Sequence, residues 1–489
     1  MRKKEVVFTK KSSSNGIVGG LAWSFAERMT AQLVSTIVGI VLARILSPEH
    51  YGIIAIVMVF ITICNVFVTS GFGTAIVQKK YVDESDYNTA FIMSLAISVA
   101  MYVALFLSAP LIADFYQMDE LCLVIRILGI RLIITSVNTI QQAHIQRAMQ
   151  FKKFFIATSF GTIISGIVGV TCALKGFGVW ALVAQYLTNT TVDTIVLLVV
   201  DKWKPKFNFS VTKAKEIYSF GWKVLCTELV FTLENDIRSL LVGKVFGPAD
   251  LAFYDQGKKY PSLLVNNVNS SIQKVLLPVL SRKQDDLIEL KNTLRKCVKV
   301  GMYILCPILI GFASVSKVFV IAVLTEKWLF AVPYMIIFSI SYLTRPIESA
   351  CHQAILAIGK SGLVFWIMVA INATSLAGVI FSTFVLRSVL WIAIFSLITT
   401  LISLCCFFIA TNVYINYTFH EQLLDTFPVI LMSSVMGGVV YFIGTISINV
   451  WILLMLQIIS GAAIYLGLSM ITNNEAYSYV RNMIRQKIK

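Results

Sequence analysis

The sequence predicts an all-α polytopic membrane protein with about 14 transmembrane helices, arranged as two parallel six-helix lobes and two extra C-terminal helices. Three observations predict this class. Hydrophobic residues make up 57% of the 489 residues, and charged residues only 13%, about half the usual share of a soluble protein. Continuous apolar runs of about 20 residues recur along the chain, each long enough to cross a bilayer as a helix. A polar sequence pattern also occurs twice.

Loop signals place the expected spans in order along the chain. Their centres lie near residues 29, 64, 98, 130, 164, 188, 231, 268, 307, 343, 371, 398, 437 and 461. The first apolar segment follows a basic stretch and is too long for a signal peptide, so it is expected to remain as the first span. We expect spans 1–6 in an N-lobe (1–205), spans 7–12 in a C-lobe (206–412), and spans 13–14 with a basic tail in 413–489.

The distribution of Lys and Arg predicts that both termini lie in the cytoplasm. Of the 41 basic residues, 26 fall in segments that this orientation puts inside, and only 6 fall in segments that it puts outside. The inside segments include five basic residues before position 12, five from 202 to 215 and six from 282 to 299. The net charge of +16 is therefore attributed to topology and to attraction toward anionic membrane lipids, not to nucleic-acid binding.

The repeated pattern is "ARILSPEHYG" at residues 43–52 and "GKVFGPADLA" at residues 243–252. Each runs from a small residue through a base, two apolar residues and a turn residue to proline and then acid. Pro48 and Pro248 are expected to stop a helix and fix a tight external connection. Six spans separate the copies, so they share one orientation, and a duplicated six-helix unit is expected. Two such lobes suit alternating access around a site between them.

The chain offers no sign of catalysis. No loop is long enough for a soluble domain, no Asp-x-Asp motif occurs in a loop, and the four histidines are scattered. No metal or cofactor site is predicted. A membrane polymerase or acyltransferase would need a large external loop or a histidine-centred site.

The repeat residues also carry a family resemblance. "LARILSPEHYGIIAI", "GFGTAIVQKK", "GFGVWALVAQYL" and the stretch from 246 to 286 resemble the polysaccharide transporter family of Wzx-type flippases in the multidrug/oligosaccharidyl-lipid/polysaccharide exporter superfamily. The resemblance covers about residues 15–410 and implies a MATE-like fold in the bacterial cytoplasmic membrane. The implied activity is moving lipid-linked oligosaccharide to the outer leaflet for surface polysaccharide synthesis.

Lipid II flippases of this superfamily carry an Arg-Asp pair where this chain has Val38 and Gly39. That departure favours O-antigen, capsule, exopolysaccharide or teichuronic-type repeat units over a peptidoglycan precursor. The implied partners are a polyprenyl-pyrophosphate-linked oligosaccharide and, left open, a polysaccharide polymerase and glycosyltransferases.

A charge inside a span is costly, so each one is a candidate functional residue. Arginine suits pyrophosphate because its guanidinium makes paired hydrogen bonds. The candidate phosphate- and sugar-binding residues are Arg28, Arg131, Arg238, Arg345 and Lys274.

Coupling to H⁺ or Na⁺ stays open, with candidate carboxylates Glu228, Glu234, Asp236 and Asp193. The alternative for several charges is mutual neutralisation on one helix face, as for Glu234 with Arg238 and Arg345 with Glu348. The alternative function is a MATE-like exporter of drugs or small molecules on the same fold.

Overall fold

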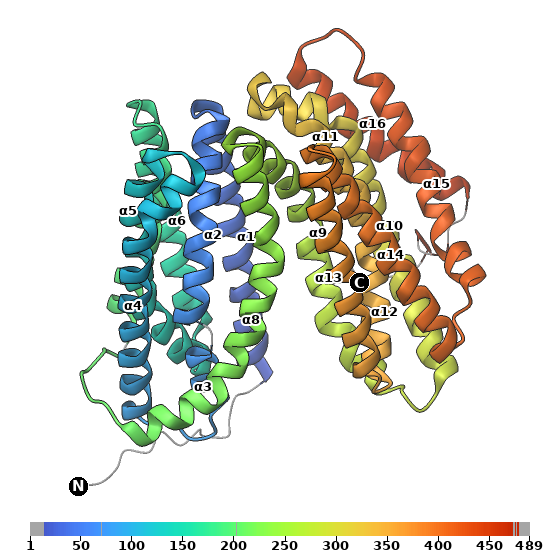
Figure 1. Ribbon diagram of the computed structural model, residues 1–489. Helices are drawn as coiled ribbons and strands as arrows, with labels where there is room; N and C mark the ends of the chain where they lie inside the picture. The colour runs from blue at the N-terminus through green and yellow to red at the C-terminus, as the bar shows by residue number, and fades with distance from the viewer. Residues whose placement is uncertain (1–13, 70, 202, 473–474, 476, 479–489) are drawn as a thin grey trace. The chain divides into compact units, whose positions relative to one another are not determined.

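The computed structural model describes residues 14–69, 71–201, 203–472, 475, 477 and 478, and every regular element among them is helical (Figure 1). The all-helical prediction is confirmed. The chain divides into two compact units, residues 1–252 and 253–489. Each unit is described by itself.

Unit 1 contains seven long helices and one short one among its described residues. They are α1 (Ser14–Ile45), α2 (Pro48–Thr69), α3 (Phe72–Gln78), α4 (Glu84–Tyr116), α5 (Asp119–Arg147), α6 (Phe151–Leu174), α7 (Val179–Val200) and α8 (Val211–Val245). Helix α9 (Pro248–Ser281) begins in unit 1 and continues into unit 2.

Unit 2 continues with α10 (Leu287–Phe319), which runs into a π-helical turn (Val320–Leu324). The next span is broken into a 3₁₀ segment (Glu326–Ala331), α11 (Val332–Ser341), a 3₁₀ turn (Tyr342–Thr344) and α12 (Arg345–Ala357). Four unbroken helices follow: α13 (Ser361–Phe384), α14 (Val389–Ile415), α15 (Phe419–Ile443) and α16 (Val450–Ile471).

Each of the fourteen expected span centres falls in a helical segment. Among the described residues, however, only 10 helices are both long and apolar enough to cross a membrane. Helices α5, α8 and α9 are not among the 10, and of α1 only Thr30–Ile45 appears, as a shorter apolar helix. The charged candidates Arg28, Arg131, Arg238 and Lys274 lie in these four helices, α1, α5, α8 and α9 respectively.

The repeat has matching local geometry in its two copies. Residues 46–47 join α1 to α2, and residues 246–247 join α8 to α9. Helices α6 and α13 are both 24 residues long, and each follows a left-handed residue, Met149 (φ 54°) in one copy and Gly359 (φ 77°) in the other. Pro48 and Pro248 occupy the first position of α2 and α9, so they begin the following helices rather than stop the preceding ones.

The two repeated stretches touch one another inside unit 1. A Cβ atom added to Gly52 of α2 would lie 1.8 Å from the carbonyl oxygen of Pro248. At the opposite end of α2, a Cβ on Gly71 would lie 2.4 Å from the carbonyl oxygen of Gly221. Helix α8 therefore runs antiparallel along α2. The compact unit ends at Ala252, whereas the repeat places the lobe boundary at residue 205; that boundary and the one at 412 stay predictions.

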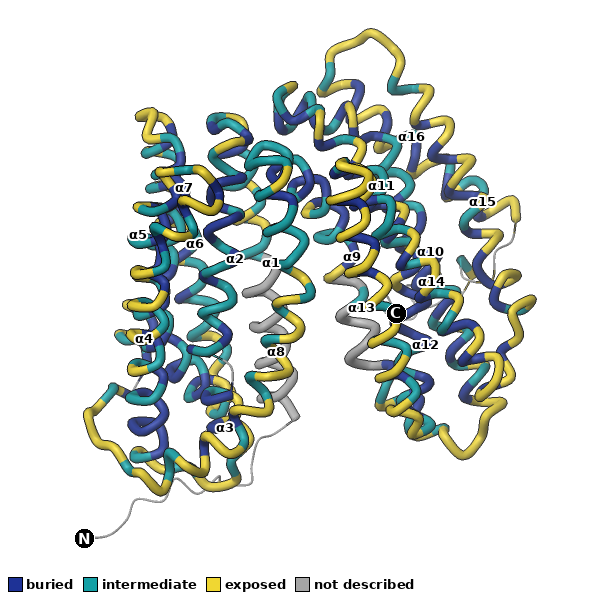
Figure 2. The backbone as a smooth tube through the Cα atoms, viewed as in Figure 1, coloured by how far each residue is buried: buried dark blue, intermediate teal, exposed yellow. Residues whose placement is uncertain are grey.

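The burial pattern separates packed faces from apolar outer faces on the helices of both units (Figure 2). In unit 2 a large buried cluster joins α9, α10, α12, α14, α15 and α16. The Tyr465 hydroxyl of α16 donates to the Tyr303 carbonyl oxygen of α10 at 2.9 Å. The two C-terminal helices are thus integrated into the core of unit 2.

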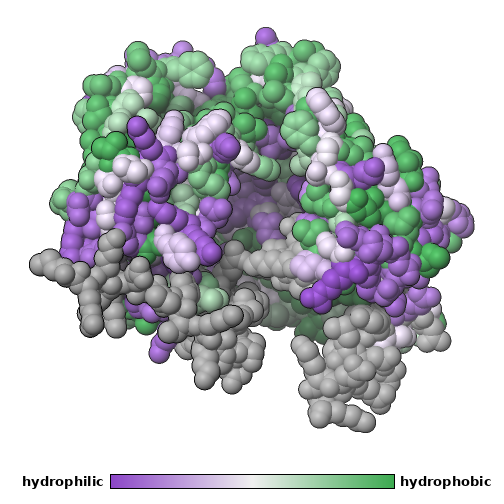
Figure 3. Space-filling view, turned by 90° about the horizontal axis from the view of Figure 1, so that it is seen from below, coloured by the Kyte–Doolittle hydropathy of each residue, from purple (hydrophilic) through white to green (hydrophobic). Residues whose placement is uncertain are grey.

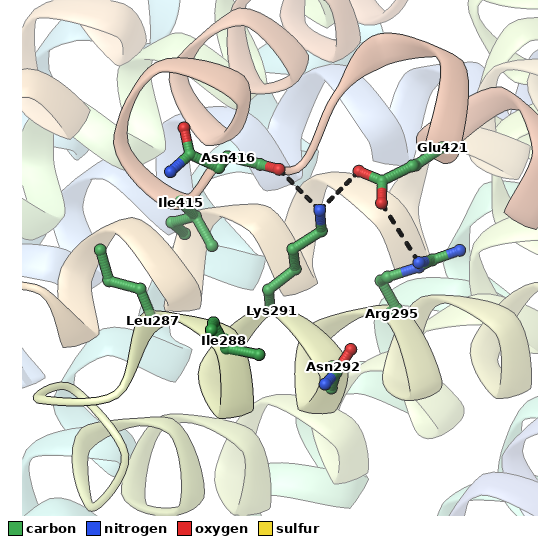
Figure 4. Close-up of a pocket in the computed structure, with 8 residues that line it drawn as sticks. All are labelled: Leu287, Ile288, Lys291, Asn292, Arg295, Ile415, Asn416 and Glu421. Carbon is green, nitrogen blue, oxygen red and sulfur yellow. Dashed lines mark hydrogen bonds and ion pairs between the residues drawn. The ribbon is translucent and has the colours of Figure 1, made fainter.

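Ion pairs fasten α15 to the first turns of α10. Arg295 donates from Nε and a terminal nitrogen to the two carboxylate oxygens of Asp425, at 2.7 and 2.8 Å. Lys291 and Arg295 both point toward Glu421, and Lys291 also donates to the Asn416 carbonyl oxygen (Figure 4). Seen from the end that carries α3, hydrophilic residues gather on the helix ends of each unit (Figure 3). Within the cluster of Lys291, Arg295, Glu421 and Asp425 the opposite charges balance one another. We therefore assign this α10–α15 cluster a structural role.

Candidate functional site

The candidate site is a polar seam between α5 and α7 in unit 1. On α5, Arg131, Asn138 and Gln142 recur at spacings of seven and four residues, which places them on one helix face. On α7, Thr190 and Asp193 likewise share a face. Hydrogen bonds from Arg131 to Thr190 and from Asn138 to Asp193 join the two faces.

Arg131 lies partly buried at one level of the seam. Its Nε donates to the Thr190 hydroxyl oxygen at 2.8 Å, a terminal nitrogen lies 3.8 Å from the Met58 sulfur of α2, and the guanidinium sits 5.7 Å from the centre of the Tyr186 ring. No carboxylate forms an ion pair with it among the described residues. Thioether sulfur is a weak acceptor, so most of the guanidinium donors remain available to an anion.

Asp193 lies at the next level and is held from one side only. Its Oδ2 accepts from the Asn138 amide at 2.6 Å, and Asn138 in turn accepts from Gln142 at 2.5 Å. The other carboxylate oxygen, Oδ1, is buried and has no hydrogen-bond partner in the described structure. A buried carboxylate oxygen without a partner is unfavourable, so a proton or a cation at Oδ1 would relieve the cost.

The seam ends at a charged cluster just beyond α7. Asp201 has a fully buried side chain and accepts from Lys153 of α6 at 3.0 Å, while His144 Nδ1 of α5 lies 2.8 Å from its other oxygen. Burial raises the pKa of the Asp201 carboxyl, but the hydrogen bonds from His144 and Lys153 outweigh burial and hold the pKa below its usual range. The cluster ties three helices together at this end of the seam.

Replacing Asp201 by asparagine is expected to lower the stability of the protein at neutral pH by about 2–3 kcal/mol, because two charge-assisted hydrogen bonds are lost. The folded-state pKa lies below the unfolded value, so the contribution is complete above about pH 4 and is lost as the pH falls through the folded pKa. Thermal unfolding from pH 7 to pH 3 checks this. Asp201→Asn should show the smaller acid loss, and Asp285→Asn, at an exposed position, should match wild type.

The candidates on α8 lie in a different environment. Arg238 and Glu234 form an ion pair at 3.3 Å, so the neutralisation alternative holds for this pair. Glu228 is exposed, and Asp236 is partly buried. An anion at Arg238 would have to compete with Glu234, which makes Arg238 a weaker candidate than Arg131.

Arg345 begins α12 immediately after the 3₁₀ turn that breaks its span. It is exposed, lies 5.7 Å from the Tyr342 ring centre, and forms no ion pair with Glu348 in the described part of the chain. Glu348 instead accepts from the Thr344 hydroxyl. No direct ion pair joins the two side chains, and the neutralisation alternative stays a prediction for this pair.

Arg131 and Arg345 occupy related positions in the two copies of the repeat. The number of residues from Arg131 to Met149 and the number from Arg345 to Gly359 differ by about one helical turn. Each copy thus places, in the middle of its fourth span, an arginine that forms no ion pair with a described carboxylate.

Arg28 and Lys274 lie in α1 and α9, but their side chains fall outside the described residues. Sequence reasoning missed Thr190 and Tyr186 as the neighbours of Arg131, and the helix break at Tyr342–Thr344. A signal for the break was present, because Pro346 disfavours a continuous helix before it.

Comparison with known sequences gives a family match over residues 41–333, to the family described as polysaccharide biosynthesis protein. The teichuronic acid biosynthesis protein TuaB of Bacillus subtilis is 24% identical over 357 residues, covering 73% of this chain and 74% of that protein. The succinoglycan biosynthesis transport protein ExoT of Rhizobium meliloti is 21% identical over 361 residues, covering 73% and 72%.

Among solved structures, the lipid II flippase MurJ in an inward closed conformation superposes with a TM-score of 0.73 at 14% identity, covering 96% of this chain and 100% of that one. An inward-facing MATE family multidrug transporter of the MOP superfamily gives a TM-score of 0.59 at 12% identity, covering 80% and 98%. At these identities the likeness shows the fold alone, and it agrees with the MATE-like fold expected above.

Proposed function

This chain belongs to the polysaccharide biosynthesis protein family, and we propose that it is a flippase for lipid-linked oligosaccharide repeat units. It is a multi-pass protein of the cytoplasmic membrane. The proposed substrate is a polyprenyl-pyrophosphate-linked oligosaccharide, moved by alternating access for the synthesis of a surface polysaccharide. The names of the relatives, a teichuronic acid biosynthesis protein and a succinoglycan transport protein, support this substrate class.

The observation that carries the proposal is Arg131, a mid-span guanidinium without an acidic partner among the described residues. A flippase must lower the cost of moving two phosphates through hydrocarbon, and a partly desolvated arginine does so by charge-assisted hydrogen bonding. Arg345 supplies a second guanidinium, exposed at a helix break, and such breaks are typical of transporter binding sites. We propose that both arginines bind pyrophosphate during transport, with Arg28 and Lys274 as further candidates.

The proposal includes fourteen spans in two parallel six-helix lobes, with both termini in the cytoplasm. The matched connections of the repeat support the duplicated unit, and the Lys and Arg distribution supports the orientation. Cysteine labelling from each side of the membrane at Lys175 and Lys360 would test the orientation. The proposal requires Lys175 outside and Lys360 inside.

Asp193 is the coupling carboxylate that the geometry favours over Glu228, Glu234 and Asp236. Its Oδ1 is buried and has no hydrogen-bond partner in the described structure, whereas Glu234 is paired with Arg238 and Glu228 is exposed. Transient binding of H⁺ or Na⁺ at Asp193 Oδ1 would link the proton or sodium gradient across the membrane to movement of unit 1.

The alternative function is export of drugs or small molecules, which the MATE-like fold also permits. The buried, partly unsatisfied carboxylate of Asp193 is the feature that would suit a cationic guest. Exporters of cationic drugs are expected to line their site with carboxylates and aromatic rings, whereas the mid-span arginines favour an anion.

A cellular experiment separates the two functions. In a strain that lacks this chain, a flippase leaves the lipid-linked repeat unit on the cytoplasmic side, protected from a glycan-cleaving enzyme added outside spheroplasts. Restoring the wild-type chain should expose the glycan to cleavage. A chain that restores resistance to cationic drugs without exposing the glycan would favour the exporter.

A further inference from the structure

The stretch from Trp203 to Lys223 has an apolar face that the core of unit 1 does not cover. On α8, Val211, Tyr218 and Trp222 follow one another at spacings of seven and four residues and share one side of the helix. Tyr218 is 60% exposed and Trp222 46% exposed. Ile217, on another side of the helix, is buried with residues of α3, α4 and α5. The first turns of α8 therefore have one packed face and one open face.

The connection before α8 also exposes apolar side chains. Phe207 and Phe209 are both exposed, while Trp203 is buried against Tyr87 and Phe91 of α4. Trp203 thus anchors the connection to unit 1, while Phe207, whose ring meets only the edge of Phe91, and Phe209 stay exposed. Aromatic side chains exposed beside basic ones are typical of segments at the membrane surface.

The lysines of this stretch fall into two groups. Lys206 pairs with Glu84 at 2.6 Å, and Lys213 pairs with Asp86 at 3.6 Å, so acidic side chains at the start of α4 neutralise these two. Lys204, Lys215 and Lys223 are exposed, and none of the three forms an ion pair with a described residue. Lys215 lies on the same side of α8 as Val211 and Trp222. The open face is therefore both apolar and positively charged.

The length of α8 also leaves its first part outside the hydrocarbon core. The helix has 35 residues, whereas a bilayer core needs about 20. In Figure 1 the first turns of α8 run across the end of unit 1 before the helix rises along α2. Gly221, whose backbone meets that of Gly71, lies between these two parts. The surplus turns are those that carry the open face.

We propose that residues 203–223 form an interfacial anchor that binds the phosphate groups of anionic phospholipids in the adjacent leaflet. Lys204, Lys215 and Lys223 contact the headgroups, and the exposed aromatic rings lie at the level of the headgroup–acyl boundary. The partner is the bulk anionic lipid of the leaflet, not the transported substrate. This anchor does not depend on the proposed flippase function.

Fluorescence quenching of Trp222 by brominated lipids tests the anchor. The full-length protein is placed in nanodiscs of fixed phosphatidylglycerol and phosphatidylcholine content, with bromine on the chains of one lipid or the other. The difference between wild type and Trp222→Phe isolates the signal of Trp222 from the other tryptophans. Brominated phosphatidylglycerol should quench Trp222 at least about fivefold more effectively, since each lysine near an anionic surface contributes about that factor.

Neutralising the three outward lysines together, as Lys204→Gln, Lys215→Gln and Lys223→Gln, should bring the two lipids to about equal quenching. The matched control is Lys206→Gln, only two residues from Lys204, whose exposed pair with Glu84 contributes little to stability. That control should keep the wild-type preference. Equal quenching by both lipids in wild type, or an unchanged preference in the triple variant, would overturn the proposal. Absence of quenching by either lipid would also overturn it, because protein would then cover the face.

Discussion

Arg131→Ala is expected to lower the rate of lipid-linked oligosaccharide translocation by about 10- to 100-fold. The factor corresponds to losing hydrogen bonds between a guanidinium and a phosphate, about 1.5–3 kcal/mol. The substrate would then cross without the Arg131 guanidinium. Among the described residues, this mid-span cation is hydrogen-bonded to Thr190 and has no acidic partner. Flipping of a fluorescent lipid-linked oligosaccharide in proteoliposomes measures the rate.

Two matched variants separate phosphate binding from local packing. Arg131→Lys keeps the charge but loses the paired geometry, so it should retain part of the rate. Thr190→Val removes the hydroxyl that accepts from Arg131 and leaves the charge in place, so its rate should stay within a few-fold of wild type. A wild-type rate for Arg131→Ala, at equal protein incorporation, would show that Arg131 is not a substrate-binding residue.

Gly52→Ala is expected to destabilise the protein by about 3 kcal/mol and to lower its Tm in detergent by roughly 6–12 °C. The added methyl group would lie 1.8 Å from the carbonyl oxygen of Pro248. The obstacle is a backbone atom, so no side-chain rotation relieves the overlap, and the first turns of α2 and α9 would have to separate. Thermal unfolding followed by circular dichroism measures the change.

Gly438→Ala is the control for helix propensity, because it also lies inside a helix but has no atom within 4 Å of the added Cβ position. It should be neutral or slightly stabilising. If Gly52→Ala and Gly438→Ala have the same Tm, then the repeated stretches "ARILSPEHYG" and "GKVFGPADLA" do not pack as closely as described.

The sequence was sufficient to predict the helical class and the positions of the helices, because both depend on local signals. Apolar runs marked the helices, and proline and turn residues marked connections such as 46–47 and 246–247. The cost of an isolated charge in hydrocarbon was also enough to identify Arg131, Arg345 and Asp193 as residues to consider.

The partners of those charges could not be predicted, because they depend on how each helix is rotated about its axis. A helix that is apolar on most sides carries no strong periodic signal for that rotation. The contact of Arg131 with Thr190, and the packing of α8 along α2, therefore emerged only from the three-dimensional structure. For the same reason, spacing alone could not distinguish Glu234 and Arg238, which form a direct ion pair, from Arg345 and Glu348, which form none in the described structure.

Sidedness of substrate transfer in proteoliposomes tests the central claim most directly. Purified protein is reconstituted with a fluorescent polyprenyl-pyrophosphate oligosaccharide in both leaflets, and a membrane-impermeant reagent then quenches the outer pool. If the chain is a flippase, quenching should proceed beyond the outer half toward completion, and an excess of unlabelled lipid-linked oligosaccharide, but not of a cationic drug, should slow it. Quenching that stops at the outer half, while the same vesicles transport the drug, would contradict the account.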